Sequence, residues 1–192
     1  MQRFQTRRRA FSRVVLLAVG VLVFAVGIGL LLSALLEGRS SALAPESKAL
    51  RLTVPVMRRA KNLPVYDAAP SGYESALRRS SVHVRGTGWP WQEGANVYIA
   101  GHRLGYPGTR SWLVFRDLDK LQNGDEVILT DANGTRYTYE VFKEFTFGPN
   151  EERVLEPVAS RSVVTLQSCT LPNYARRIAV QAELVDVIER AG

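Results

Sequence analysis

An uninterrupted apolar segment near the N-terminus limits what this chain of 192 residues can fold into. The 23 residues from Val14 to Leu36 read VVLLAVGVLVFAVGIGLLLSALL and contain no charged side chain. As an α-helix, with a rise of about 1.5 Å per residue, they would extend roughly 34 Å, enough to cross the hydrocarbon core of a bilayer. A core helix of a small domain has no need to be apolar on every side over that length. The segment therefore predicts a transmembrane anchor over residues 14–36.

The charge of the chain is concentrated before that segment. The formal net charge is +7, and residues 1–13 contribute five arginines and no acid, which leaves 20 basic against 18 acidic residues elsewhere. Basic residues near a membrane span stay on the cytoplasmic side, so residues 1–13 are expected to be a cytoplasmic tail and the rest to lie outside the cell. The later basic residues form no stripe interleaved with aromatic residues, which argues against nucleic acid as a partner.

A cleaved signal peptide is the competing interpretation of the N-terminal segment. The residues ALA at 42–44 resemble a small-residue cleavage site. However, the apolar run is much longer than the roughly 7–15 residues of a signal-peptide core. An uncleaved signal-anchor is therefore favoured, with localisation at the cell membrane.

The chain after the anchor divides into a short linker and one domain. Residues 37–51 are rich in small and polar side chains and are expected to be a stalk, followed by a domain over residues 52–192. The domain consists of short apolar runs separated by turn residues, with short helices expected at 72–80 and 115–125. The segment 126–147 alternates on both sides of Asp-Ala-Asn-Gly, which is typical of a β-hairpin. Seven or eight short strands with little helix predict a mainly β fold, a closed or nearly closed barrel.

The lone cysteine is the next constraint. Cys169 is the only cysteine of the chain, so no disulfide within the chain is available, and with His83 and His102 as the only histidines no convincing zinc site exists. Cys169 ends the apolar strand VVTLQSC, His102 ends VYIAGH, and Arg177 opens RIAV. These three residues are therefore expected to meet at one mouth of the barrel.

This trio suits acyl transfer through a thioester. A thiol near a cationic side chain forms its nucleophilic thiolate more readily. An imidazole protonates a leaving amine, and an arginine stabilises the oxyanion of a tetrahedral intermediate. Each residue also has a structural interpretation: a lone cysteine in a strand is often a packing residue, and either Arg176 or Arg177 must face solvent on a strand. From the residues alone, an enzyme and a non-enzymatic domain remain open.

Three motifs in register resemble those of the sortases, the membrane-anchored cysteine transpeptidases of Gram-positive bacteria. TLQSC at 165–169 is similar to the TLxTC signature, IAGHR at 99–103 to the histidine motif, and RRIAVQAELV at 176–185 to the last barrel strand. The resemblance covers roughly residues 52–188. It implies an eight-stranded sortase-type β-barrel in which Cys169 is the nucleophile, His102 the general acid/base and Arg177 the residue that stabilises substrate and oxyanion.

The resemblance also implies substrates and partners. Sortases cleave an LPXTG-type sorting signal of a secreted protein between Thr and Gly, then transfer the thioacyl group to an amine of a peptidoglycan precursor or a pilin. The short loop between Cys169 and Arg177 resembles class E and class D enzymes, and class E relatives prefer LAXTG. Ser168 stands where the family usually has threonine, and His83 is expected not to be catalytic. No cofactor is expected; Glu151 and Glu152 are acids of the kind that bind calcium, but such acids occur on any surface loop.

Three other classes of protein are alternatives to a sortase. An L,D-transpeptidase also has histidine before cysteine, but its motif has a Ser-His-Gly-Cys character that LQSCTLP lacks. A papain-like or NlpC-type peptidase has its cysteine before its histidine, the reverse of the order here. A tethered β-domain that binds a cell-wall partner without catalysis predicts that Cys169 is unreactive toward a mild alkylating agent.

Overall fold

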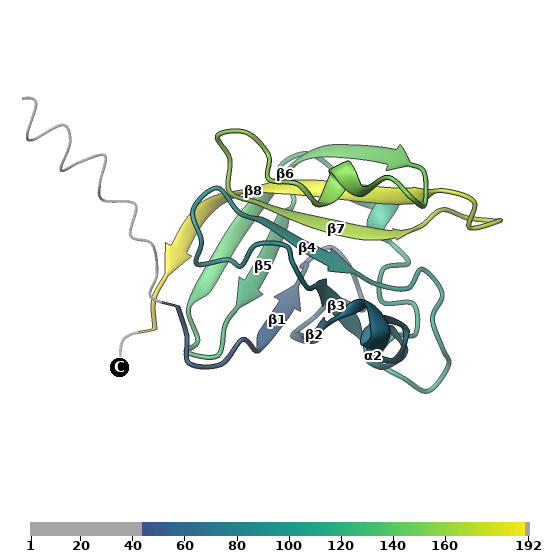
Figure 1. Cartoon of the computed structure of the whole chain (residues 1–192), viewed down its shortest axis with the longest axis horizontal. Coiled ribbons are helices and arrows are strands. Elements are labelled where there is room, and N and C mark those ends of the chain that lie inside the picture. The colour runs from purple at the N-terminus through teal and green to yellow at the C-terminus, as the bar shows by residue number, and fades with distance from the viewer. Residues whose placement is uncertain (1–43, 191–192) are drawn as a thin grey trace, which may run out of the picture. The chain divides into compact units, whose positions relative to one another are not determined.

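A closed barrel of eight strands forms the part of the chain that the structure, a computed structural model, describes: residues 44–190 (Figure 1). Around the barrel the strands follow the order β1-β2-β3-β4-β7-β8-β6-β5. Their bounds are β1 Leu50–Thr53, β2 Leu63–Ala68, β3 Ser81–Val84, β4 Asn96–Ala100, β5 Glu126–Thr130, β6 Arg136–Phe147, β7 Val163–Cys169 and β8 Arg177–Ile188. The predicted mainly β class and barrel are confirmed.

Helical structure is scarce in the described residues. The α-helix α2 (Tyr73–Arg79) lies between β2 and β3, preceded by the 3-10 turn η1 (Pro70–Gly72). Two further 3-10 turns are η2 (Leu118–Lys120) and η3 (Glu152–Leu155). Leu77 of α2 is buried with Ala68, Val82 and Ala100, so the helix packs on the outer side of the strands β2, β3 and β4.

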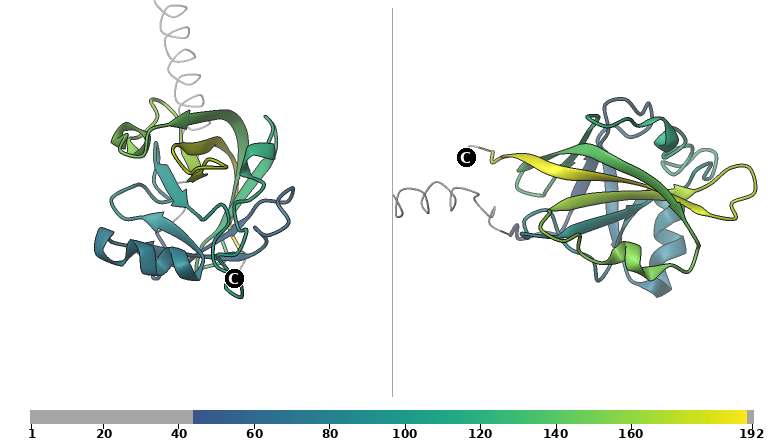
Figure 2. Two further views of the ribbon diagram at one scale, coloured as in Figure 1. Left: turned by 90° about the vertical axis from the view of Figure 1, so that its right-hand side faces the viewer. Right: turned by 90° about the horizontal axis from the view of Figure 1, so that it is seen from above.

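Two of the strand pairs are parallel. β2 pairs with β3 through a crossover that contains α2, and β4 pairs with β7; the other neighbours are antiparallel. Because β3 and β4 are antiparallel, the C-terminal ends of β2 and β3 lie at one end of the barrel and those of β4 and β7 at the other. Figure 2 shows the β7–β8 loop at one end and the start of the described chain at the other.

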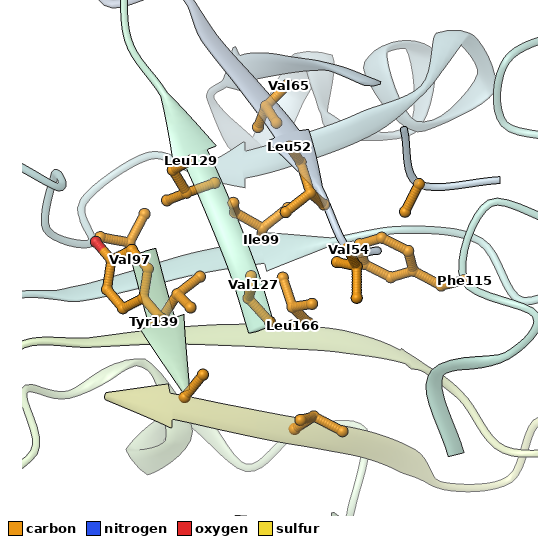
Figure 3. Close-up of a cluster of buried hydrophobic side chains, with 14 of the residues drawn as sticks. Leu52, Val54, Val65, Val97, Ile99, Phe115, Val127, Leu129, Tyr139 and Leu166 are labelled. Carbon is orange, nitrogen blue, oxygen red and sulfur yellow. The ribbon is translucent and has the colours of Figure 1, made fainter. Parts of the chain in front are cut away.

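The barrel interior is filled by apolar side chains that alternate along each strand. Leu52, Val65, Ile99, Leu129 and Leu166 belong to one buried cluster (Figure 3). Along β4, Val97 and Ile99 face this interior, so the side chains between them face the outer surface. On β4, β7 and β8, the inner face therefore carries the side chains that pack in the core, and the outer face carries the others.

The β5–β6 hairpin forms as its turn residues predict. One carboxylate oxygen of Asp131 accepts hydrogen bonds from the backbone N–H groups of Asn133, at 2.9 Å, and Thr135, at 3.0 Å. Gly134 has a φ of +86°, in the left-handed region that glycine adopts without strain. The Asp-Ala-Asn-Gly segment therefore reverses the chain by satisfying its own backbone donors.

The structure differs from the sequence predictions in two elements. The segment 115–125 forms turns and η2 rather than an α-helix, and β3 is a strand that was not among those expected. The predicted basic tail, anchor and most of the stalk lie outside the described residues. Within 44–190, no helix has the length and apolar character needed to cross a membrane.

Candidate active site

The ends of β4 and β7 are held side by side. Ala100 is the register partner of Gln167, and the backbone N–H of Gly101 donates to the carbonyl of Gln167 at 3.0 Å. The buried hydroxyl of Ser168 donates to the carbonyl oxygen of Gly101 at 2.8 Å. His102 and Cys169, the next residues of the two strands, therefore occupy neighbouring positions.

Cys169 and Arg177 are register partners across β7 and β8. Cys169 is a free, half-buried cysteine. Arg177 is half-buried and its Nη1 donates to the carbonyl oxygens of Tyr174, at 3.2 Å, and Arg176, at 3.4 Å. The exposed Arg176 instead donates to the carbonyl of Thr146 on β6, at 3.0 Å. Of the two arginines, Arg177 is therefore the one beside the cysteine.

The three predicted residues come together on the outer face of the sheet. Leu166 and Ile178 point into the barrel core. Cys169 and Arg177 lie an odd number of residues from them along β7 and β8, so these two side chains share the outer face. His102 follows β4 in phase with the outward-facing Ala100, which packs under α2. The three residues thus lie where β4 and β7 end and β8 begins, with their side chains outside the barrel core; that they form one catalytic site stays a prediction.

His102 lies beneath a small cluster of polar side chains. Its ring meets the ring of Tyr106 edge-on at 5.4 Å, and the Tyr106 hydroxyl donates to Glu74 of α2 at 3.2 Å. Arg78 lies over the Tyr106 ring at 4.7 Å. Among residues 44–190, Nε2 of His102 is buried without a hydrogen-bond partner.

Burial lowers the pKa of His102; the Glu74 carboxylate opposes this shift and the Arg78 guanidinium reinforces it. Because the ordinary pKa is 6.5 and the net shift is downward, the resting imidazole is neutral at pH 7. A neutral imidazole accepts a proton from a thiol and returns it to a leaving group.

Two tyrosines flank the site and were not identified from the sequence. Burial raises the pKa of Tyr73, at the start of α2, to about 12, with Arg177 lowering it and Cys169 raising it. Burial likewise raises the pKa of Tyr98, and Arg177 is close enough to lower it. Tyr98 shares the outward phase of β4 with His102, a period-two signal present in the sequence. Tyr73 carries no such signal because it reaches the site through the packing of α2.

The segment after His102 packs against the site from behind. A Cβ on Gly101 would lie 2.8 Å from the ring of Phe115, so a glycine here allows the Phe115 side chain to approach the backbone closely. The Phe115 N–H donates to the carbonyl of His102 at 3.2 Å. Arg103 is buried and forms an ion pair with Asp119. The segment after His102 thus holds the His102 carbonyl and the side chain of the next residue, Arg103.

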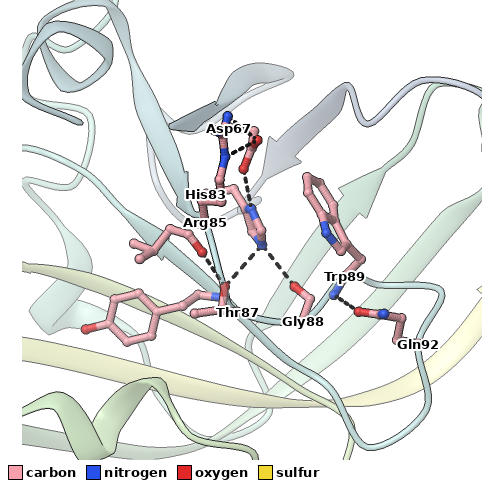
Figure 4. A network of polar contacts seen from close by, with 9 residues as sticks. Asp67, His83, Arg85, Thr87, Gly88, Trp89 and Gln92 are labelled. Carbon is pink, nitrogen blue, oxygen red and sulfur yellow. Dashed lines mark hydrogen bonds and ion pairs between the residues drawn. The ribbon is translucent and has the colours of Figure 1, made fainter. Parts of the chain in front are cut away.

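His83 lies apart from these residues. It pairs with Ile99, is almost wholly buried and contacts Asp67, Thr87 and Gly88 (Figure 4). No group of three or more His, Cys, Asp or Glu side chains in the described part of the chain is arranged as a metal site.

The sequence matches the family model described as "Sortase domain" over residues 52–185. Sortase A of Streptococcus agalactiae serotype III (strain NEM316) is 34% identical over 90 residues, which cover 46% of this chain and 36% of that protein. The match therefore spans about a third of that relative's length.

Solved structures are similar over a larger part of the chain. Sortase C-3 from Streptococcus pneumoniae has a TM-score of 0.64 and 28% identity, over 77% of this chain and 67% of that one. Sortase A from Corynebacterium diphtheriae, a lid mutant, has a TM-score of 0.62 over 75% of this chain and 73% of that one. At 23% identity, the latter likeness concerns the fold alone.

Proposed function

The chain belongs to the sortase family, and we propose that it is a membrane-anchored cysteine transpeptidase that cleaves sorting signals and transfers the acyl product to an amine. The observation that supports the proposal is the register pairing of Cys169 with Arg177, together with the position of His102 two residues beyond β4, the strand that pairs with β7. An imidazole, a thiol and a guanidinium on one face provide the base, the nucleophile and the oxyanion donor of acyl transfer.

In the first half-reaction His102 takes the proton of the Cys169 thiol, and the sulfur attacks the carbonyl carbon of the scissile peptide bond. The guanidinium of Arg177 donates hydrogen bonds to the oxyanion of the tetrahedral intermediate. The carbon–nitrogen bond then breaks as the imidazolium of His102 protonates the departing amine. The product is a thioester on Cys169 and a released peptide with a free N-terminus.

In the second half-reaction an amine attacks the thioester. His102 accepts the proton from the attacking nitrogen and passes it to the sulfur as the carbon–sulfur bond breaks, which restores the Cys169 thiol and the neutral imidazole. The buried, unpartnered Nε2 of His102 suits this role, because a base without a partner in the folded chain is available for proton transfer. Water in place of the amine gives hydrolysis.

The proposed substrates are secreted proteins that carry an LPXTG-type or LAXTG-type signal, cleaved between Thr and Gly. The acceptor is an amine of a peptidoglycan precursor or a pilin. The seven residues between Cys169 and Arg177 form a short loop, which favours a class E-like or class D-like enzyme. With the anchor at 14–36 and the arginines of residues 1–13 in the cytoplasm, the catalytic domain lies outside the cell.

The test is a cleavage and transfer assay on the full-length chain in neutral detergent. LPXTG and LAXTG peptides are incubated with and without a small amine, and products are identified by mass spectrometry. Cleavage after Thr with amine-dependent transfer supports a sortase, and the ratio of the two peptides decides the subclass. Cys169→Ala, which removes only the sulfur, serves as the control and is expected to show neither reaction.

A separate measurement distinguishes an inactive enzyme from a binding domain. Iodoacetamide should alkylate Cys169 in the folded protein, as followed by mass. If neither peptide is cleaved and Cys169 resists alkylation, the enzyme hypothesis is wrong and a tethered β-domain remains.

A further inference from the structure

We propose that a second site, at the opposite end of the barrel from Cys169, binds a phosphate-type oxyanion. A pocket of about 360 Å³ opens beside the C-terminal ends of β2 and β3. Its lining includes Lys48, Asp67, Arg85, Trp89 and Gln92. None of the three proposed catalytic residues lines this pocket, so the proposal stands independently of the proposed function.

The wall of the pocket is a packed stack of rings. The centroid of His83 lies 4.0 Å from that of Trp89, and Trp89 stacks on Trp91 at 5.1 Å. Figure 4 shows His83 between Asp67 and Gly88, with Trp89 alongside. His83 and Trp89 are almost wholly buried, so the pocket has a preformed wall rather than a surface that must first be ordered.

Asp67 is the only acid of the described residues that lines the pocket, and its carboxylate already contacts other side chains. Nδ1 of His83 lies 3.2 Å from Oδ1 of Asp67, while Nε and Nη2 of Arg85 donate to Oδ2 at 3.1 and 2.9 Å. Burial works to raise the pKa of Asp67, but these contacts outweigh it and hold the pKa below its ordinary value. The carboxylate is thus ionised and used internally, and it neutralises one of the pocket's cations.

The polar groups that remain in the pocket are donors. The Lys48 ammonium lies 5.3 Å above the Trp89 ring, and no acidic side chain of the described residues lies within ion-pair distance of it. Oε1 of Gln92 accepts a hydrogen bond from the backbone N–H of Trp89, at 2.8 Å. The side-chain N–H groups of Gln92 are left as donors. Nη1 of Arg85 is not used in its contact with Asp67.

His83 adds no acceptor to this set. Its two ring nitrogens face Oδ1 of Asp67 and the carbonyl oxygen of Gly88, 2.9 Å away. The hydroxyl of Thr87 donates to the carbonyl of Val84 at 2.8 Å. Its oxygen therefore faces Nε2 of His83 as an acceptor. An anion would therefore find an ammonium, a guanidinium N–H and an amide N–H among the side chains that line the pocket.

A phosphate group matches this donor set better than a single carboxylate. Lys48 precedes β1 and Arg85 follows β3, so the two cations approach from separate segments. A phosphate monoester carries between one and two negative charges and three acceptor oxygens, and can therefore contact both cations and the amide together. The ligand chemistry is that of an oxyanion on phosphorus.

The position of the pocket indicates two sources of such a group. Lys48 lies two residues before β1, where the described chain enters the barrel. Eleven residues lie between Leu36, the end of the proposed anchor, and Lys48, so the two are about 40 Å apart at most in an extended chain. A phospholipid headgroup is therefore one source, and a soluble phosphate ester is the other.

The test is the acylation rate of Lys48, measured by mass spectrometry on the full-length chain in neutral detergent. Lys61 is an internal control, because it is exposed in the β1–β2 connection at the other end of β1. Inorganic phosphate is added at constant ionic strength, with chloride as the matched salt. At about ten times the half-saturating concentration, acylation of Lys48 should slow about tenfold while that of Lys61 is unchanged.

The lipid source has its own arm. The chain is placed in nanodiscs of phosphatidylcholine alone or with phosphatidic acid, whose headgroup is a phosphate monoester, without added phosphate. Protection of Lys48 by phosphatidic acid but not by free phosphate assigns the headgroup, and protection by free phosphate assigns a soluble ester. Equal Lys48 acylation under all conditions overturns the proposal.

A pair of arginine variants tests the site itself. Arg85→Gln should abolish the protection of Lys48, whereas Arg59→Gln, an exposed arginine of the β1–β2 connection, should retain it. Protection that survives in Arg85→Gln overturns the proposed site. If Arg85→Gln fails to fold, as judged by thermal unfolding, the wild-type comparison of phosphate with chloride still decides.

Discussion

The hydroxyl of Ser168 donates a hydrogen bond to the backbone carbonyl oxygen of Gly101, 2.8 Å away, and so joins the residues that immediately precede Cys169 and His102. The bond is buried and crosses 67 positions of sequence. It adds a side-chain contact to the backbone pairing of β4 and β7, next to the proposed base His102 and the proposed nucleophile Cys169.

We expect Ser168→Ala to lower both stability and turnover. Removal of the hydroxyl leaves the buried Gly101 carbonyl without this donor, at a cost of about 1–3 kcal/mol in the free energy of unfolding. Turnover should fall further than the loss of folded protein explains, because only backbone bonds then hold the ends of β4 and β7 together. Ser168→Thr keeps the hydroxyl and should retain most activity. Denaturant unfolding and the peptide assay check both; equal turnover in Ser168→Ala and wild type would contradict the positioning role.

The two consecutive arginines should differ sharply in their effect on catalysis. Arg177 is the register partner of Cys169, whereas Arg176 is exposed and bonded to Thr146. Loss of an oxyanion donor typically lowers turnover by about 10²–10³-fold, which we expect for Arg177→Ala. Arg176→Ala should change it by only about twofold, as for a surface side chain.

Arg177→Lys separates charge from geometry. Lysine keeps the positive charge but loses the planar set of N–H donors, so its turnover should lie between those of wild type and Arg177→Ala. Values of kcat/KM for the three variants provide the comparison. Equal losses in Arg176→Ala and Arg177→Ala would show that neither arginine is specifically aligned with the reacting carbonyl.

Much of the fold was predictable because its signals are local. The β5–β6 turn is specified by Asp131 and Gly134. Strand alternation puts Arg177 and Ile178 on opposite faces of β8, and Ile178 lies in the core. β3 has only four residues, too few for a period-two pattern to stand out. The segment 115–125 has charged and apolar residues compatible with a helix, but its packing around the buried Leu118 produced only a 3-10 turn.

The surroundings of the site were less predictable because they depend on contacts between distant segments. The sequence alone shows that His102 and Cys169 end apolar runs and that Arg177 opens one. The bond between Tyr106 and Glu74 spans 32 positions, and no periodicity links a loop to a short helix across that distance. The position of Tyr73 beside Cys169 likewise follows from how α2 packs on the barrel, which is a tertiary property.

The protonation of His102 should respond in opposite directions to its two charged neighbours. The Glu74 carboxylate raises the pKa of His102 and Arg78 lowers it. We therefore expect Glu74→Gln to lower this pKa further and Arg78→Gln to raise it. NMR titration of the imidazole Cε1–H signal measures both, with His102→Gln used to assign the signal against that of His83. Shifts of the same sign in the two variants would show that the charges do not act on the ring directly.

The same burial makes stability depend on pH. Because the folded state holds the pKa of His102 below its ordinary value of 6.5, the unfolded chain binds the proton first as the pH falls. The contribution of His102 to stability is complete above pH 6.5 and is lost as the pH falls from there through the folded pKa. His102→Gln should reduce the slope of unfolding free energy against pH in that window. An unchanged slope would assign the dependence to other groups.

The ion pair behind the site should matter more than its exposed neighbour. Arg103 directly follows His102, is only 5% exposed and pairs with Asp119 of η2. Asp119→Ala leaves a buried guanidinium without its partner; because Asp119 is half-exposed, we expect a loss of about 1–3 kcal/mol, less than for a fully buried pair. Asp117→Ala breaks a pair with the exposed Lys120, expected to contribute about 0–1 kcal/mol.

Glu144 provides a second measurement for this pair. Burial and the neighbouring Asp119 raise the pKa of Glu144, while Arg103 lowers it. Removal of Asp119 should therefore bring the pKa of Glu144 down and let it interact more strongly with Arg103, so Asp119→Ala combined with Glu144→Gln should cost more than the two single changes added. Chemical denaturation of the four proteins gives this coupling directly. Strict additivity, or an equal loss in Asp117→Ala, would mean that Arg103 is held by packing alone, and that the loop after His102 is positioned by Phe115 rather than by charge.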